Sequence, residues 1–92
     1  MKTKFQNIFG DSNRIKVLEF YLESGEIAFP IEAVVEEKNI GKSQTYEIVK
    51  DMKKKGILIE KGIYDKKKFY QLNTKEKSVY LLKKLFSEAI RK

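Results

Sequence analysis

The stretch that follows Gly41 constrains the fold more than any other part of the chain. A helix built from it has one face of apolar or small side chains and one face of polar and charged side chains. The segment before it, Lys38-Asn39-Ile40-Gly41, contains the two residue types that most readily adopt positive φ in a tight turn. The sequence therefore predicts a helix over 30–38, a tight turn, and a helix over 42–55 whose apolar face consists of Thr45, Ile48, Val49 and Met52.

An earlier helix is predicted over 12–23. Ser12 is a good N-cap residue, apolar side chains follow it at helical spacing, and Gly25 can close the helix in a left-handed conformation. A short extended stretch over 27–29 then leads to the helix that begins at Pro30.

After Gly56 the pattern changes to short runs of β-branched and aromatic residues, which predict strands over 57–61 and 69–72. We expect 62–68 to form a loose charged loop, because this segment is too long for a two-residue hairpin turn. A final helix is predicted from Asn73 or Thr74 to about Ile90.

This order of elements predicts an α+β fold of the winged helix-turn-helix class. Its parts are a three-helix core, a two-stranded β-wing and a C-terminal dimerisation helix. We expect residues 1–73 to form the DNA-binding core and residues 74–92 to form the dimerisation helix. A chain of 92 residues leaves no room for a second catalytic domain.

The composition excludes most enzyme and metal chemistry and favours a polyanionic partner. Cysteine and histidine are both absent, so we expect no disulfide, no Cys/His metal site, no cofactor and no enzyme activity. Residues 1–37 carry four basic and seven acidic side chains, whereas residues 38–92 carry sixteen and six. Positive charge of this kind attracts nucleic acid, although a heat-adapted or A·T-rich source is an alternative explanation. Without a signal segment or a long apolar run, the expected location is the cytoplasm.

Four short segments resemble the archaeal members of the winged-helix regulator superfamily, which includes MarR-like and PadR-like repressors. Their order and spacing carry the resemblance, which spans residues 8–73: Ile8 to Ser12 leading into 17–20, Ile40 to Tyr46, Met52 to Leu58, and Tyr70 to Asn73. Asn39 stands where such proteins often have Gly, and Gly41 where they usually have a Ser or Thr cap. The resemblance implies a transcription regulator, most often a repressor that acts by occupancy.

The polar face of the helix over 42–55 supplies the candidates for reading base edges in a major groove, which are Ser43, Gln44, Tyr46 and Glu47. Glutamine can pair bidentately with adenine, and glutamate can accept a hydrogen bond from cytosine. Because arginine is almost absent, we expect a site rich in A·T pairs. The alternative is that this face is simply solvated.

Lysines flank this face and also lie in the two-stranded β-wing, mostly at its tip. We expect them to contact phosphates or the minor groove. They are Lys42, Lys50, Lys61, Lys66, Lys67 and Lys68. The alternative function of the ribbon lysines is to keep a hairpin soluble and unpaired.

The apolar stripe of the final helix is too wide for a lone surface helix, so we expect it to pair with a second copy. The stripe consists of Val79, Leu82, Leu85, Phe86, Ala89 and Ile90, and Phe5, Ile8 and Phe9 extend it. Such a homodimer would bind an inverted repeat of double-stranded DNA. The helix could instead fold back on its own domain. Two rival functions remain open, namely a plasmid or chromosome partition protein that binds a centromere-like array, and a winged helix used for protein contact.

Overall fold

Three helices form the core that the sequence predicts, in a computed structural model that describes residues 3–90 except for the side chains of 4, 5, 89 and 90. They are α2 (Asn13–Ser24), α3 (Ile31–Lys38) and α4 (Lys42–Lys54), and the predicted boundaries are correct to within one residue. The tight turn between α3 and α4 also forms as expected, because Asn39 has a left-handed conformation with φ 55°. The sequence pattern was sufficient here because both helices have well-defined apolar faces.

The sheet has three antiparallel strands in the order β1-β3-β2, one more than predicted. The strands are β1 (Phe29–Pro30), β2 (Leu58–Tyr64) and β3 (Lys67–Leu72). Strand β1 shares only Phe29 with the extended stretch predicted over 27–29, and it pairs through Phe29 with Tyr70. Pro30 belongs to this strand and caps α3, whereas the sequence had placed it inside the helix.

The wing formed by β2 and β3 differs from the loose loop expected between them. The two strands pair as far as Tyr64 and Lys67, so a two-residue turn of Asp65 and Lys66 joins them. Both turn residues have positive φ, 52° and 64°. A two-residue turn with this backbone suits the right-handed twist of a hairpin. Its usual residues are Asn and Gly, so Asp65 and Lys66 gave no signal that predicted it.

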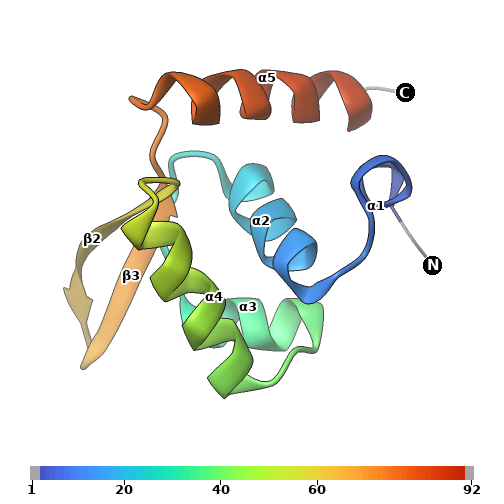
Figure 1. Cartoon of the computed structure of the whole chain (residues 1–92). Helices are drawn as coiled ribbons and strands as arrows, with labels where there is room; N and C mark the ends of the chain where they lie inside the picture. Colours follow the sequence, from blue (N-terminus) through green and yellow to red (C-terminus); the bar gives the residue numbers. More distant parts are fainter. Residues whose placement is uncertain (1–2, 91–92) are drawn as a thin grey trace.

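Two further helices lie at the ends of the described chain (Figure 1). Helix α1 (Lys4–Phe9) was not predicted and packs against both α2 and α5 (Lys77–Ile90). The final helix begins later than expected, because the Asn73 side-chain amide donates to the Gly56 carbonyl oxygen at 2.9 Å instead of capping it. Within the described residues, no helix is long and apolar enough to cross a membrane.

The core lies between α2, α4, α5 and the base of the sheet. Among the described side chains, helices α2, α3, α4 and α5 and strands β2 and β3 each contribute at least one buried apolar residue. The set comprises Val17, Phe20, Tyr21, Leu22, Val34, Ile40, Val49, Met52, Leu58, Tyr70, Leu72, Val79 and Phe86. Burial raises the pKa of the Tyr21 hydroxyl, which donates to the Phe29 carbonyl oxygen and so ties α2 to the sheet.

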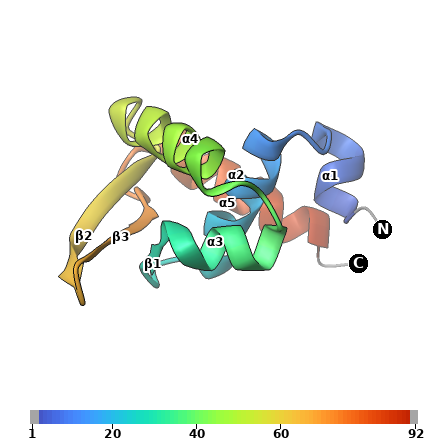
Figure 2. The same ribbon diagram turned by 90° about the horizontal axis from the view of Figure 1, so that it is seen from below.

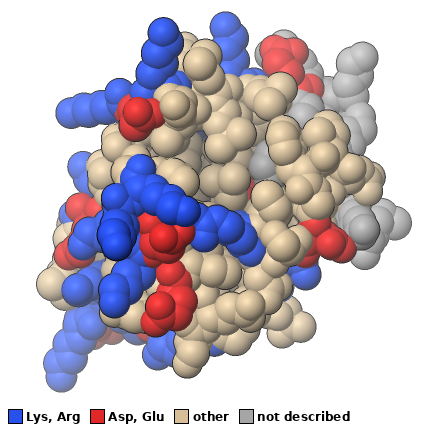
Figure 3. Space-filling model, in the orientation of Figure 1, with Lys and Arg blue, Asp and Glu red and all other residues tan. Residues whose placement is uncertain are grey.

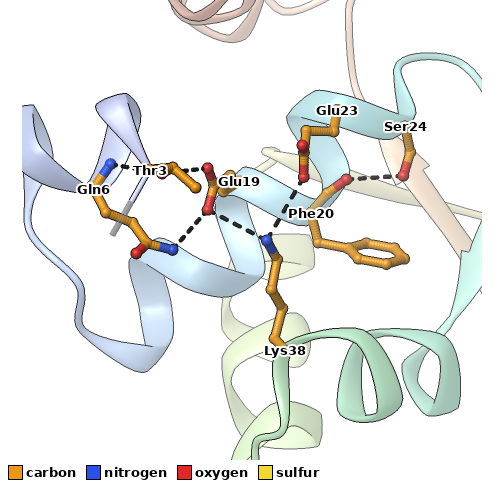
Figure 4. A network of polar contacts seen from close by, with 7 residues as sticks. All are labelled: Thr3, Gln6, Glu19, Phe20, Glu23, Ser24 and Lys38. Atoms are coloured by element: carbon orange, nitrogen blue, oxygen red, sulfur yellow. Dashed lines mark hydrogen bonds and ion pairs between the residues drawn. The ribbon is translucent and has the colours of Figure 1, made fainter. Parts of the chain in front are cut away.

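A buried carboxylate joins three of the helices (Figure 4). Glu19 of α2 is 1% exposed. Its two oxygens accept hydrogen bonds from Thr3 at 2.7 Å, Gln6 at 2.8 Å and the Lys38 ammonium at 3.3 Å. A buried charge is tolerated when it is paired and hydrogen-bonded, and here its partners come from α1 with its cap and from α3.

Candidate nucleic-acid interface

Helix α4 presents its polar face to solvent because its other face is anchored in the core. Val49 and Met52 are buried, and so is Thr45, whose hydroxyl donates to the Gly41 carbonyl oxygen at 2.9 Å. Ile48 packs against the core beside them, and the polar residues on the other side of the helix therefore point outward. Tyr46 is 47% exposed, and Ser43, Glu47 and Lys50 are also exposed.

The outer face of α4, the start of α3 and the wing line one groove. Figure 2 shows these three elements around a common space, with α4 and α3 on two sides and the wing at one end. Seven of the ten predicted DNA-contacting residues line it, and they come from both α4 and the wing: Lys42, Ser43, Tyr46, Glu47, Lys66, Lys67 and Lys68. Ile31, Glu32 and Tyr70 complete the lining. Two segments that are about 20 residues apart in the sequence thus meet at one concave, lysine-edged surface.

The remaining three predicted residues lie outside this lining. Gln44 is turned toward α2, where its side-chain oxygen accepts a hydrogen bond from Asn13 at 2.8 Å. Lys50 is exposed, and its ammonium lies 5.9 Å from the centre of the Tyr46 ring, which fixes both side chains relative to each other. Lys61 is the extra residue of a bulge in β2, between Glu60, which pairs with Tyr70, and Gly62, which pairs with Phe69.

Tyr64, near the tip of the wing, packs back on its own hairpin. Its ring meets Phe69 edge-on, with the ring centres 5.2 Å apart. It also lies so close to Gly62 that a Cβ added there would come within 3.2 Å of it. Ile63, in contrast, is exposed and shares a face of the sheet with its partner Lys68.

Carboxylates around α4 were not predicted as part of the site. Asp51 accepts from Arg14 of α2 at 2.6 Å and pairs with Lys55 at 3.2 Å, and these hydrogen bonds lower the pKa of its carboxyl group. Only the spacing of four between Asp51 and Lys55 was visible in the sequence, since Arg14 is 37 residues away.

Two further ion pairs connect α4 to its neighbours. Lys53 pairs with Glu60 of β2 at 3.0 Å, which raises the pKa of the lysine and lowers that of the glutamate. Lys42 pairs with Glu32 of α3 at 3.5 Å, inside the groove. These pairs join residues that are distant in sequence, so no local pattern could have revealed them.

The apolar stripe of α5 is divided between the core and the surface. Val79 and Phe86 are 4% and 2% exposed, so the chain itself covers these two members of the predicted stripe. Leu82 packs against the core, whereas Leu85 is 49% exposed and Leu81 is exposed as well. The side chains of Ala89 and Ile90, like that of Phe5, lie outside the described residues.

Figure 3 shows basic side chains over the wing and α4, with acidic side chains among them, and further basic side chains along α5. Helix α5 lies at the opposite end of the molecule from α3 and from the first turn of α4 (Figure 1).

The helices, the tight turn and the hairpin together define a winged-helix fold. The structure is similar to that of reduced HlyU from Vibrio cholerae N16961, with a TM-score of 0.70 over 97% of this chain and 87% of that chain. The two sequences are 10% identical, so the likeness concerns the fold alone. No protein-family model and no curated protein matches this chain in sequence.

Proposed function

We propose that this chain is a sequence-specific double-stranded DNA-binding protein that regulates transcription as a homodimer in the cytoplasm. The observation that carries the proposal is the groove, because the exposed face of α4 and the lysine-tipped wing line the same surface. A B-DNA major groove is about 12 Å wide and admits one helix. With α4 in the major groove, the wing lysines would reach phosphates or the adjacent minor groove.

The side chains of α4 that are exposed in the groove would contact the base edges. Ser43 and Glu47 offer a hydroxyl and a carboxylate, which suit base-edge donors such as the cytosine amino group, while Tyr46 offers a ring with a hydroxyl. Gln44 already accepts from Asn13, so to read adenine its oxygen would have to accept through its second lone pair or release Asn13.

The homodimer that we propose uses the exposed part of the apolar surface at α5 and α1. Leu81 and Leu85 of α5 are about half exposed, and Ile8 of α1 is 65% exposed. This surface is remote from the groove, so pairing there leaves both copies of α4 free to contact DNA. A two-fold dimer of this kind would bind an inverted repeat and would repress by occupying the site.

Selection of binding sites from random duplex DNA tests the proposal. We expect enrichment of A·T-rich half-sites in inverted orientation, about one helical turn of 10–10.5 base pairs apart or a multiple of it. Replacing Tyr46 and Glu47 by Ala should change the enriched sequence, because these side chains line the groove. Replacing Glu36 and Glu37, which lie at a different surface hollow, should leave it unchanged.

Two results would count against the proposal. One is failure to bind any duplex even at low salt, which would favour the protein-contact function. The other is an enriched site that the Tyr46 and Glu47 replacements leave unaltered. Cooperative spreading from one site in footprinting would favour the partition function over transcription regulation.

A further inference from the structure

We propose that Glu32 neutralises Lys42 at the first turn of α4, so that the wing lysines and not Lys42 supply phosphate-binding charge at the groove, and that Glu32 restrains binding to non-specific DNA. This inference rests on the proposed function.

Among the described residues, Lys50 and Lys54 of α4 form no ion pair, but three other lysines in or directly after this helix do. Lys42 at the first turn is paired with Glu32, Lys53 with Glu60, and Lys55 with Asp51. Among the described residues, no carboxylate lies within ion-pair distance of the wing lysines, Lys66, Lys67 and Lys68. Lys68 is near enough to Glu60 to help lower the pKa of that carboxyl group, but it forms no pair with it.

Paired and unpaired lysines contribute differently to the salt dependence of DNA binding. An unpaired lysine that neutralises a phosphate releases a counterion from the DNA, and each such contact changes the slope of log K against log salt by about −0.9. Lys42 is already partly neutralised by Glu32, and while the two remain paired Lys42 contributes less to the release of counterions than an unpaired lysine does.

Glu32 also acts through its place in the groove. It lies in the first turn of α3, and together with Glu47 it adds negative charge to a surface edged by lysines. A duplex that enters without the correct base contacts meets repulsion from these carboxylates, with no compensating hydrogen bonds. The penalty falls mainly on non-specific binding, and negative elements of this kind are a general source of specificity.

The test compares Glu32→Gln with Glu37→Gln, two charge-neutral substitutions on the same helix. Glu37 lies away from the groove, so this variant controls for the change in net charge. The probe is a 30-base-pair duplex of random sequence, titrated over a range of salt concentrations. We expect Glu32→Gln to steepen the slope by about 0.9 and to raise affinity roughly threefold, as for loss of an exposed ion pair. Glu37→Gln should leave the slope unchanged.

A second pair of variants tests the lysines directly. Lys67→Ala should flatten the slope by about 0.9, whereas Lys42→Ala should leave it almost unchanged. Equal slopes for the two glutamine variants, or equal flattening by the two alanine variants, would overturn the inference while leaving the proposed function intact. Absence of duplex binding by the unmodified protein would overturn both, and melting curves establish that each variant is folded.

Discussion

Asp51 holds α4 in place through residues that are not part of the core. Its carboxylate accepts from Arg14 in the first turn of α2, and the neighbouring Asn13 donates to Gln44 near the start of α4. Two polar contacts from one turn of α2 therefore hold α4 at points about two helical turns apart. Because a base contact requires placement to a fraction of an ångström, such side chains influence the site without touching DNA.

Replacing Asp51 by Asn should lower the melting temperature slightly at neutral pH, and this difference should vanish in acid. Its hydrogen bonds hold the pKa of the folded carboxyl below its ordinary value of 3.8, so the unfolded chain takes up the proton first. The stabilisation is fully present above pH 3.8 and is lost as the pH falls through the lower folded value. Melting curves from pH 2 to 7 measure the effect.

Glu37→Gln is a suitable control for this pH series. No ion pair or side-chain hydrogen bond to Glu37 is present among the described residues, so its removal should leave the melting temperature close to that of the unmodified protein across the whole range. A difference between the Asp51 variant and the unmodified protein that persists undiminished at pH 2 would show that the carboxylate's charge is not what stabilises the structure.

The turn at the tip of the wing contains two residues in an unfavourable backbone conformation. Asp65 and Lys66 both have positive φ, where Gly or Asn is favoured and a longer side chain costs about 1 kcal/mol. Only these two residues are unpaired at the end of the hairpin, because Tyr64 and Lys67 on either side of the turn are paired. The lysines at the tip therefore move with the sheet, and little conformational entropy is lost when they contact DNA.

Lys66→Gly should change stability and DNA binding in opposite directions. Removing the side chain relieves the left-handed strain and should stabilise the protein by about 0.5–1 kcal/mol, measured by chemical denaturation. It also deletes one unpaired cation and should weaken binding to all duplexes. A variant that loses both stability and affinity would indicate that Lys66 holds the hairpin together instead.

Pattern and periodicity predicted the elements whose structure is decided locally. The prediction of helix α4 was correct because its apolar and polar faces are well separated. The prediction of the turn at Asn39 was correct because its residues favour positive φ. Helix α1 has only six residues, and its docking depends on Gln6 meeting a buried carboxylate from another helix, which no local pattern reveals. The ion pairs of the groove escaped prediction for the same reason.

At the scale of the whole molecule, neighbouring residues of α5 belong to different surfaces. Phe86 is enclosed by the core, and Leu85 beside it faces solvent on the apolar surface shared with α1. The sequence predicted an apolar stripe but could not assign its members, because the area that a core covers depends on the packing of distant elements.

Substitutions at these two positions should separate folding from dimerisation. Phe86→Ala should destabilise the chain by about 3–5 kcal/mol, the usual cost of removing a large buried aromatic side chain. Leu85→Glu should leave the melting curve nearly unchanged but convert a dimer to a monomer and weaken binding to an inverted repeat. Light scattering at micromolar concentration measures the mass, and a dimer that survives Leu85→Glu would exclude this face of α5 as the interface.

The hydrogen bonds of Glu19 connect the start of the described chain to the segment that leads into α4, the helix proposed to contact DNA bases. The carboxylate that holds Thr3 and Gln6 also holds Lys38, which directly precedes the turn into α4. Deleting the first nine residues would remove two of the three donors of this buried carboxylate and leave Lys38 as its only partner in this network, so the loss would act directly before the turn into α4.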